Sequence, residues 1–420
     1  MGRRAALLVF ALVGLLPATT GCRSHQRTPP PLDRLNPANW IPADAPRLTA
    51  RPQAPTEPAP PPPISPAAFQ TSNLLADPTH PAPVLRRPHH ILVLSGGGSY
   101  GAFTAGVLNG WSRTGTRPEF DVVTGISTGA LIAPLAFSGQ KKDHEMRRLY
   151  TEIETKDVFR MRSWATLPFR DAAASSAPLR RIVETTMSPE FIAEIGVEHR
   201  KGRRLYVGTT NLDARRFTIW DLGAIAARGG DDSRKLIIDV LIASASVPGV
   251  FPPVSIEVEV DGKRYTELHV DGGVTAPLFL PMDVLRVAGA KSGTIPTAAP
   301  TMYVIVAGKY HEDPAAVQSR VLKVLGAAAG AYFRGHLRSE MANLYHAGKL
   351  DSVTYRAAAL RQDFTTGLSK LDFDPDEMTK LYAEGIRVGA GGPAWDTTPP
   401  ERAPGDDATI RVGTKFRTGP

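Results

Sequence analysis

The sequence has little that points to redox, metal or nucleic-acid chemistry. It contains a single cysteine, Cys22, so an intrachain disulfide is excluded. No spacing of cysteine, histidine or carboxylate residues is typical of a metal site, and no internal repeat is evident. Lysine and arginine do not cluster with interleaved aromatic residues, which argues against a nucleic-acid surface. We therefore expect no metal, no cofactor and no nucleic-acid partner, while protein partners stay open.

The amino-terminal segment has the composition of an export signal. Two arginines begin it, residues 5–16 are apolar but too short to span a bilayer, and small residues precede Cys22. A lone cysteine at this point resembles the lipid acceptor of a bacterial lipoprotein. We expect a signal peptide over residues 1–22, lipidation of Cys22 and an outer-membrane anchor facing the periplasm. Because Thr19 stands where leucine is usual, cleavage without lipidation, giving a secreted or periplasmic protein, stays an alternative.

Composition divides the rest of the chain into three parts. Residues 23–87 are dense in proline and lack a sustained apolar period, which predicts a semi-rigid tether. Residues 88–391 are enough for one α/β domain with a sizeable core. Proline, glycine and charges over residues 392–420 predict a disordered tail. The net charge of +8 favours contact with an anionic membrane surface or phosphate head groups.

The order of apolar and glycine-rich segments predicts one βαβ unit. Residues 91–94 are an apolar, β-branched run that ends at three glycines, and residues 102–111 follow with apolar side chains at helical spacing. A short strand at 121–123 and an apolar helix at 130–137 repeat this plan around Ser127. The length of about 30 residues is what a right-handed parallel crossover requires. The sequence therefore predicts an α/β fold with a mainly parallel sheet.

The segment Gly125-Ile126-Ser127-Thr128-Gly129 predicts a sharp strand-to-helix turn. Such a turn exposes the serine hydroxyl at the carboxyl edge of the sheet, and flanking glycines let neighbouring backbone approach closely. Ser127 is therefore a candidate nucleophile. A turn with only a structural role is the alternative, because a Gly-x-Ser-x-Gly segment also arises by chance.

The run Gly96-Gly97-Gly98 ends the first predicted strand beside a helix N-terminus. Successive N–H groups there can face one point, and the helix dipole favours an anion. The loop is therefore a candidate oxyanion hole for acyl transfer. Phosphate binding is the alternative, but the segment through Gly101 lacks the Lys-Ser or Lys-Thr end of a P-loop, and only Glu119 or Asp121 stands where a ribose-binding carboxylate is expected.

A carboxylate follows a predicted β-hairpin later in the chain. The hairpin spans residues 254–260 and 264–270, turns at Asp261-Gly262, and ends at Asp271-Gly272-Gly273. The two glycines leave the carboxylate at the strand end uncrowded. Asp271 is therefore a candidate base. Asp213, after an earlier predicted strand, is a competing carboxylate, for which a solvated turn position is the alternative.

Four motifs in this order resemble the bacterial members of the patatin-like phospholipase family. They are the first glycine run with Gly101, the Ser127 turn from Gly125 to Gly129, residues 243–253 (Ala-Ser-Ala-Ser-Val-Pro-Gly-Val-Phe-Pro-Pro), and Asp271-Gly272-Gly273. The likeness extends from about His90 to about Gly391.

The resemblance implies a specific activity and a specific fold. It implies a three-layer α/β/α domain in which Ser127 is the nucleophile, Asp271 is its base, and residues 96–98 form the oxyanion hole. It also implies a phospholipase A or related carboxylic ester hydrolase that acts on phospholipid or another acyl ester without a metal. One departure is Tyr100, at a position where the family often has arginine or lysine.

The remaining segments predict the elements around this centre. Further strands are expected at 204–212, 217–222 and 301–307, and helices at 141–155, 176–187, 236–244, 314–347 and 375–388. Asp313 and Asp374 are expected to cap the last two helices. Trp164, Leu167 and Phe169 lie in a loop before the second helix, where they line an acyl-binding cleft, form a membrane-facing rim or pack in the interior.

Two alternatives to the dyad hydrolase stay open. The first is a hydrolase with a histidine base: His269 is nearest in sequence to the candidate aspartate, and His336 and His346 lie in a predicted helix. The second is a non-catalytic, lipid-binding envelope lipoprotein that retains the fold.

Overall fold

The computed structural model describes residues 89–162, 171–260, 263–289, 299–313, 316–391 and 395–400. The predicted signal peptide with Cys22 and the predicted tether lie outside the described residues, as does most of the predicted tail. The loop residues Trp164, Leu167 and Phe169 and the hairpin turn Asp261-Gly262 also lie outside them.

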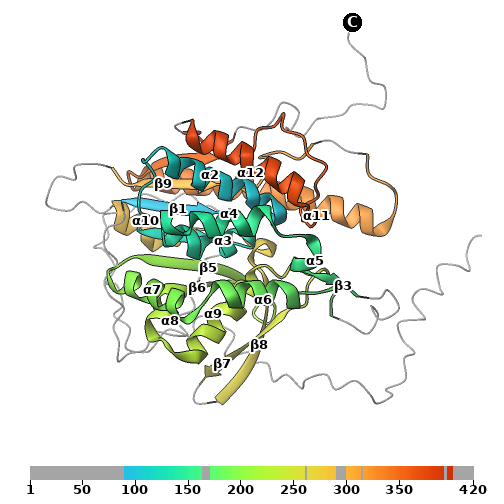
Figure 1. Ribbon diagram of the computed structural model, residues 1–420, viewed down its shortest axis with the longest axis horizontal. Coiled ribbons are helices and arrows are strands. Elements are labelled where there is room, and N and C mark those ends of the chain that lie inside the picture. The colour runs from blue at the N-terminus through green and yellow to red at the C-terminus, as the bar shows by residue number, and fades with distance from the viewer. Residues whose placement is uncertain are drawn as a thin grey trace, which may run out of the picture.

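A mixed sheet of eight strands forms the centre of the domain (Figure 1). Its order is β10-β9-β1-β2-β5-β8-β7, with β6 paired to β5. The strands are β1 (His90–Leu94), β2 (Val122–Gly125), β5 (Arg204–Asn211), β6 (Arg216–Asp221), β7 (Val254–Val260), β8 (Lys263–Asp271), β9 (Thr301–Ile305) and β10 (Thr354–Ala358). From β10 to β5 every pairing is parallel, whereas β6 and β8 pair antiparallel to β5. The predicted mainly parallel sheet is therefore confirmed.

Helices cover both faces of this sheet. They are α2 (Gly101–Arg113), α3 (Thr128–Phe137), α4 (Asp143–Thr151), α5 (Thr155–Val158), α6 (Ala177–Thr186), α7 (Pro189–Arg200), α8 (Leu222–Arg228), α9 (Gly230–Ser244), α10 (Met282–Gly289), α11 (Val321–Leu350) and α12 (Pro375–Ala390). A short two-stranded sheet pairs β3 (Arg160–Met161) with β4 (Ala174–Ser175).

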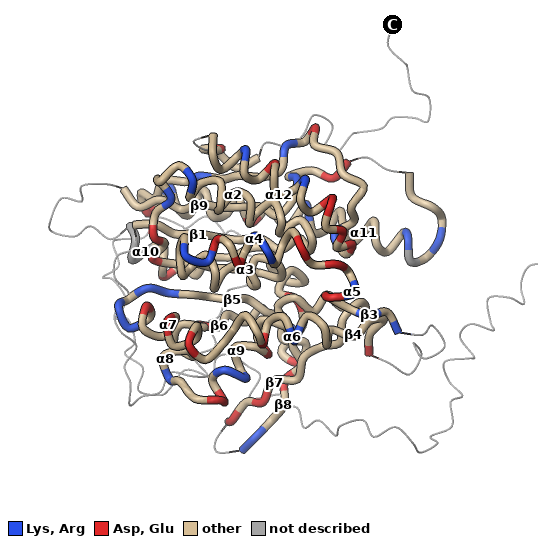
Figure 2. Tube along the Cα trace, viewed as in Figure 1, with Lys and Arg blue, Asp and Glu red and all other residues tan. Residues whose placement is uncertain are grey.

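The alternation of side chains along β1 separates two parts of the core. Leu92 and Leu94 belong to the cluster with α2, α3 and α12, whereas Ile91 and Val93 belong to the cluster with α10 and α11. Because successive side chains of a strand point to opposite faces, each face carries its own helical layer. The result is the three-layer α/β/α domain that the resemblance implied. Charged residues gather on the outer helices and loops, and β1 is free of them along its length (Figure 2).

The predicted helix over residues 314–347 begins too early. The helix α11 starts at Val321 after Arg320, which makes no side-chain cap, and Asp313 instead accepts a hydrogen bond from Lys309. Because the Asp313 carboxylate pairs with the Lys309 ammonium, it does not cap the helix. The cap at Asp374 is confirmed, since its carboxylate accepts from the Glu377 N–H at 3.0 Å.

The predicted boundary of the tail at residue 392 is also too early. Trp395 packs its ring against Trp111 at 5.0 Å between centroids, and Asp396 pairs its backbone with Ala357 in β10. A large aromatic ring that covers the interior and two backbone hydrogen bonds to the edge strand hold this segment on the domain.

Among the described residues, no helix combines the length and the apolar character needed to cross a membrane.

Candidate active site

The turn at Ser127 has the strained geometry that its glycines predicted. Ser127 has φ 54° and ψ −123°, in a region that residues with a side chain rarely adopt. A Cβ on Gly125 would lie 2.3 Å from the Gly129 carbonyl oxygen, and one on Gly129 would lie 2.7 Å from the Leu94 carbonyl oxygen. Only glycine fits at these two positions, so the sharp turn at the end of β2 depends on both.

A buried serine accepts a hydrogen bond from the backbone of this turn. The Ser127 N–H donates to Ser244 Oγ at 3.0 Å, and the Ser244 hydroxyl donates to the Gly208 carbonyl at 2.7 Å. Ser244 lies at the end of α9, inside the 243–253 motif, and is fully buried. The 243–253 motif contains this serine, but the sequence alone does not indicate its role. It joins the strained turn to β5.

The register of the sheet brings Ser127 and Asp271 to the same level. Gly125 pairs with Val207 of β5, and Asp271 pairs with Thr209 of the same strand. Ser127 follows Gly125 by two positions, as Thr209 follows Val207, so the two candidate residues meet end to end along the same edge of β5, whose other edge pairs with β6. The antiparallel direction of β8 lets its carboxyl end meet the carboxyl end of β2.

The environment of Asp271 makes it a better base than an ordinary aspartate. Its carboxylate accepts a hydrogen bond from the Gly273 N–H at 2.7 Å, and the Ser127 side chain lies close enough to lower its pKa through hydrogen bonding. Burial raises the pKa of Asp271 to about 6, against the opposing effect of these two hydrogen bonds. The side chain keeps 5% of its surface exposed and Ser127 keeps 8%, so both stay within reach of a substrate.

Two of the three predicted oxyanion-hole glycines have N–H groups available. The Gly96 N–H donates to the Pro277 carbonyl at 3.1 Å, which removes it from the predicted set of donors. The N–H groups of Gly97 and Gly98 have no acceptor within the part of the chain that the structure describes. Thr128 opens α3, and the first N–H groups of a helix have no intrahelical partner, so its N–H is a further candidate donor.

The position of this loop depends on close backbone contacts. Gly98 has φ 60°, and a Cβ there would lie 1.9 Å from the Lys370 carbonyl oxygen. A Cβ on Gly97 would lie 2.2 Å from the Ala307 carbonyl oxygen, and one on Gly101 would lie 2.2 Å from Thr128 Oγ1. These contacts explain why the loop needs glycines and join it to the Ser127 turn.

Neighbouring atoms also lie close to the two glycines that follow the candidate base. A Cβ on Gly272 would lie 2.6 Å from the Gly208 carbonyl oxygen, and one on Gly273 would lie 3.0 Å from Asp271 Oδ1. A side chain on either residue would crowd the turn that carries the carboxylate.

A cavity of about 630 Å³ opens at these residues. Gly96, Gly97, Gly98, Ser127 and Asp271 all contribute to its lining. Most of the remaining wall is apolar and comes from α4, α6, α9 and α11, with Leu149, Leu179, Ile182, Val183, Met187, Leu241, Phe251 and Phe333 as its larger members. Such a wall accepts a hydrocarbon chain without leaving polar groups unpaired.

None of the described histidines lines this cavity. His269 is fully buried, with Nδ1 at 2.9 Å from Thr209 Oγ1 and Nε2 at 3.1 Å from Glu267 Oε2. His336 pairs with Glu340, and the His346 ring packs on Tyr345. Both ring nitrogens of the histidine nearest in sequence are therefore engaged away from Ser127.

The competing carboxylate Asp213 has a structural partner. It accepts the Leu268 N–H at 2.8 Å and so ties the end of β5 to β8. It does not line the cavity. The structure therefore leaves Asp271 as the one carboxylate among the lining residues.

Residues 92–284 match the family model described as patatin-like phospholipase. The matched segment contains the Ser127 turn and ends after Asp271-Gly272-Gly273. This domain belongs to the patatin-like phospholipase family. The patatin-like domain is also similar to the cGAMP-activated phospholipase of Pseudomonas aeruginosa (strain BWHPSA011 / Pa011), with 27% identity over 177 residues. That match covers 39% of this chain and 48% of the relative, so the chain spans about half the length of the curated relative it matches.

Two solved structures are similar to the patatin-like domain at low identity. VipD from Legionella pneumophila has a TM-score of 0.38 and 12% identity, with 72% of this chain and 66% of that chain covered. The type III effector protein ExoU has a TM-score of 0.24 and 14% identity, with 73% of this chain and 53% of that chain covered.

Proposed function

We propose that this protein is a serine acyl hydrolase that cleaves carboxylic esters of lipids, in the manner of a phospholipase A or lysophospholipase. The observation that carries the proposal is the approach of the Ser127 side chain to the buried Asp271 carboxylate, at the wall of an apolar cavity that both residues line. The family match and the phospholipase relative support the same substrate class.

The first half of the reaction forms an acyl-enzyme. Ser127 Oγ attacks the ester carbonyl carbon while its proton passes to Asp271. The N–H groups of Gly97 and Gly98 stabilise the negative charge that develops on the carbonyl oxygen. The tetrahedral intermediate then breaks its bond to the alcohol, which leaves with the proton from Asp271. The acyl group remains on Ser127.

The second half releases the fatty acid. A water molecule attacks the carbonyl carbon of acyl-Ser127 and gives its proton to Asp271. Collapse of the second tetrahedral intermediate breaks the bond to Ser127 Oγ, which takes the proton back. A base with a pKa of about 6 suits both halves, because it is largely ionised at neutral pH yet accepts a proton more readily than an exposed aspartate.

The cavity favours a long acyl chain as the group transferred. Its volume of about 630 Å³ is within the usual range for ligand pockets, and its wall is apolar over most of its extent. A soluble, polar ester would leave this wall without a partner.

We place this activity at the bacterial cell envelope. The proposal rests on the export-signal composition of residues 1–22 and on Cys22 as a lipid acceptor, which together favour an outer-membrane lipoprotein facing the periplasm. A secreted or periplasmic form without the lipid is the alternative. Palmitate labelling of cells, with Cys22→Ser as the comparison, distinguishes the two.

Fatty-acid release from mixed phospholipid vesicles tests the activity. The full chain is assayed with a metal chelator present, as wild type, Ser127→Ala, Asp271→Asn and Ser339→Ala, the last an exposed serine of α11. We expect release by the wild type and by Ser339→Ala, and none above background by the other two. Vesicle binding without release by the wild type would instead support the non-catalytic lipid-binding lipoprotein.

A further inference from the structure

The cavity wall carries one positive charge among its described residues. Asp271 and Lys370 are the only lining residues with a formal charge at neutral pH. The proposed mechanism uses the carboxylate and leaves the ammonium without a role. Among the described residues, the Lys370 ammonium is the one cation of a mostly apolar wall, where partial burial opposes its charged form.

The backbone of this lysine is fixed to the oxyanion loop. The Ser99 N–H donates to the Lys370 carbonyl at 3.0 Å, the Ser99 hydroxyl to the Ser369 carbonyl at 3.1 Å, and the Tyr100 hydroxyl to the Leu368 carbonyl at 3.2 Å. Three successive carbonyls of one loop are thus held by two residues that follow Gly98. The position of Lys370 relative to the oxyanion hole is therefore set by the fold.

One aromatic ring, Phe333, lies close both to the side chain of Lys370 and to the turn that carries the proposed base. Its Nζ is 5.5 Å from the centroid of the Phe333 ring, and Cε2 of that ring is 3.2 Å from the point where a Cβ on Gly273 would lie. Phe333 and Lys370 both line the cavity. The ammonium thus shares the cavity with the reacting groups, and Phe333 connects it to the turn after Asp271.

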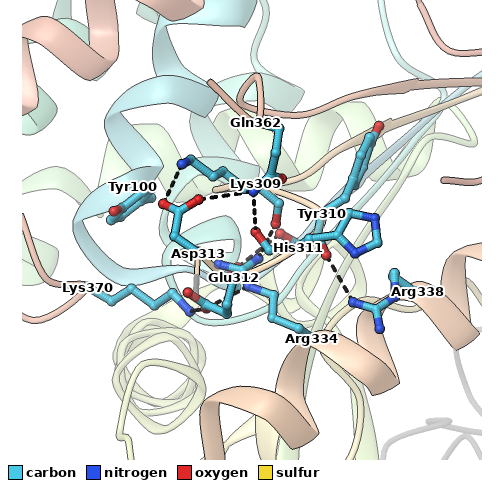
Figure 3. A network of polar contacts seen from close by, with 12 residues as sticks. Tyr100, Lys309, Tyr310, His311, Glu312, Asp313, Arg334, Arg338, Gln362 and Lys370 are labelled. Atoms are coloured by element: carbon cyan, nitrogen blue, oxygen red, sulfur yellow. Dashed lines mark hydrogen bonds and ion pairs between the residues drawn. The ribbon is translucent and has the colours of Figure 1, made fainter. Parts of the chain in front are cut away.

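Lys370 belongs to a polar network (Figure 3), in which not all of its hydrogen-bond donors have an acceptor among the described residues. Glu312 Oε1 accepts from Lys370 Nζ at 2.7 Å and from Arg334 Nε at 2.9 Å. An ammonium has three donors, and no second acceptor for Lys370 is found in the described part of the chain. Two donors therefore remain for a ligand.

The charges of this network do not cancel. Two cations, Lys370 and Arg334, share the single carboxylate of Glu312, and Arg334 is almost fully buried. Although burial raises the pKa of Glu312, the hydrogen bonds and charges of Lys370 and Arg334 lower it to about 2, so the carboxylate is ionised at neutral pH. Burial and the nearby Arg334 lower the pKa of Lys370, an effect that Glu312 opposes. A second anion beside Lys370 would complete the balance of charge.

We propose that Lys370 is a binding subsite for the phosphate of a glycerophospholipid whose acyl ester lies at Ser127. This inference rests on the proposed acyl hydrolase function. Lysine ammonium groups bind phosphate as compact charges with several donors. In a glycerophospholipid a few bonds separate the ester carbonyl from the phosphorus atom, which matches a cation near the oxyanion loop but outside the catalytic pair. The acyl chain then occupies the apolar wall, and the head group lies at Lys370.

The test compares two lipids that share their acyl chains. One is phosphatidylcholine and the other is the matching neutral diacylglycerol, each presented in detergent micelles at the same surface concentration. The measured quantity is the ratio of kcat/KM for phosphatidylcholine to kcat/KM for diacylglycerol. The variants are Lys370→Met, Lys370→Arg, Glu312→Gln and Lys380→Met, an exposed lysine of α12 that serves as the matched control.

The expected ratios follow from the charge at Lys370. Lys370→Met lowers the ratio about tenfold, since one charge-assisted hydrogen bond is lost only for the phosphate-bearing lipid. Lys370→Arg keeps most of the preference for phosphatidylcholine. Glu312→Gln raises the ratio, because the carboxylate that competes for Lys370 is removed. Lys380→Met leaves the ratio at the wild-type value. A ratio that stays constant in Lys370→Met, or equal losses with both lipids, overturns the subsite.

The same assay separates failure of the subsite from failure of the proposed function. If the wild type hydrolyses diacylglycerol, loses this activity in Ser127→Ala and shows no preference for phosphatidylcholine, the hydrolase stands and the subsite falls. If neither lipid is hydrolysed, both proposals fall. Inorganic phosphate is tested as an inhibitor of diacylglycerol hydrolysis in the same assay. If it inhibits through Lys370 while phosphatidylcholine is not preferred, the site binds free phosphate, and the lipid subsite is overturned.

Discussion

The Ser127 side chain lies close enough to the buried Asp271 carboxylate to lower its pKa, and β5 sets the level at which the two meet. One residue follows a parallel strand and the other ends an antiparallel strand, so their approach depends on two different pairings with the same neighbour. The patatin-like domain thereby holds a serine and an aspartate together without a third side chain between them.

Replacing Asp271 with asparagine should raise stability while it removes activity. Since the folded-state pKa of Asp271 is about 6 and lies above the ordinary aspartate value, stability falls as pH rises from about 4 to about 6, and the loss persists above that range. A neutral asparagine lacks this loss, so the free energy of unfolding at pH 8 should increase by up to about 3 kcal/mol. Urea unfolding of wild type and variant at pH 8 and at pH 4 measures the difference.

The two pH values provide the control for that prediction. At pH 4 the wild-type carboxyl is largely protonated, so the variant should gain little there. A variant that is less stable at pH 8, or equally stabilised at both values, would contradict the assigned cause.

The pH dependence of hydrolysis should report the same carboxyl group. Because the proposed base acts in its ionised form, kcat/KM should be retained above pH 6 and fall as pH decreases through the pKa of about 6. Carboxyl ionisation has a small enthalpy, so the midpoint should hardly move with temperature. Rate profiles measured at two temperatures test this, and a midpoint that shifts to lower pH on warming would indicate an imidazole base instead.

Gly98→Ala should remove most of the hydrolytic activity while the rest of the domain stays folded. A Cβ at this position would lie 1.9 Å from the Lys370 carbonyl oxygen, so the oxyanion loop must move. Loss of one or two aligned donors should lower kcat by about 100-fold or more. Steady-state rates on a micellar ester measure this.

Gly115→Ala is the matched control for Gly98→Ala. Gly115 has φ 70°, close to the 60° of Gly98, but a Cβ there would meet nothing within 4 Å. It should cost about 1 kcal/mol of backbone strain and leave kcat unchanged. If both variants lose activity equally, positive φ alone would explain the effect and the loop would have no special role.

Val183→Phe should shorten the acyl chain that the enzyme accepts. Val183 is buried on α6 and lines the cavity, so the added ring fills space there. Relative to short-chain esters, hydrolysis of long-chain esters should fall about tenfold. The comparison uses esters of increasing chain length, with Thr185→Phe on the exposed face of the same helix as the control. Equal profiles for the two variants would argue that the chain lies elsewhere.

The sequence predicted the central elements because their chemistry is local. Apolar runs that end in glycines mark β1 and β2, and Asp374 with Pro375 marks the start of α12. The positive φ of Ser127 likewise follows from the two glycines that flank its turn. These features depend on neighbouring residues, which a single sequence displays.

Other features depend on contacts that a single sequence does not display. The roles of Ser244 and Lys370 come from contacts with residues far away in the chain. The loss of Gly96 as a donor comes from the Pro277 carbonyl, and the place of Trp395 comes from packing on Trp111. The edge strand β10 has only five residues, too few for its alternation of side chains to stand out in the sequence.

The position of the acyl group on the enzyme decides whether Ser127 is the nucleophile. The full chain is mixed with an activated fatty-acid ester, quenched in acid within the first turnover and digested, and the acylated peptide is sequenced by mass spectrometry. We expect one acyl group on Ser127, absent in Ser127→Ala and formed much more slowly in Asp271→Asn. Acylation at another residue, or ester hydrolysis with no acyl-enzyme and full activity in Ser127→Ala, would contradict it.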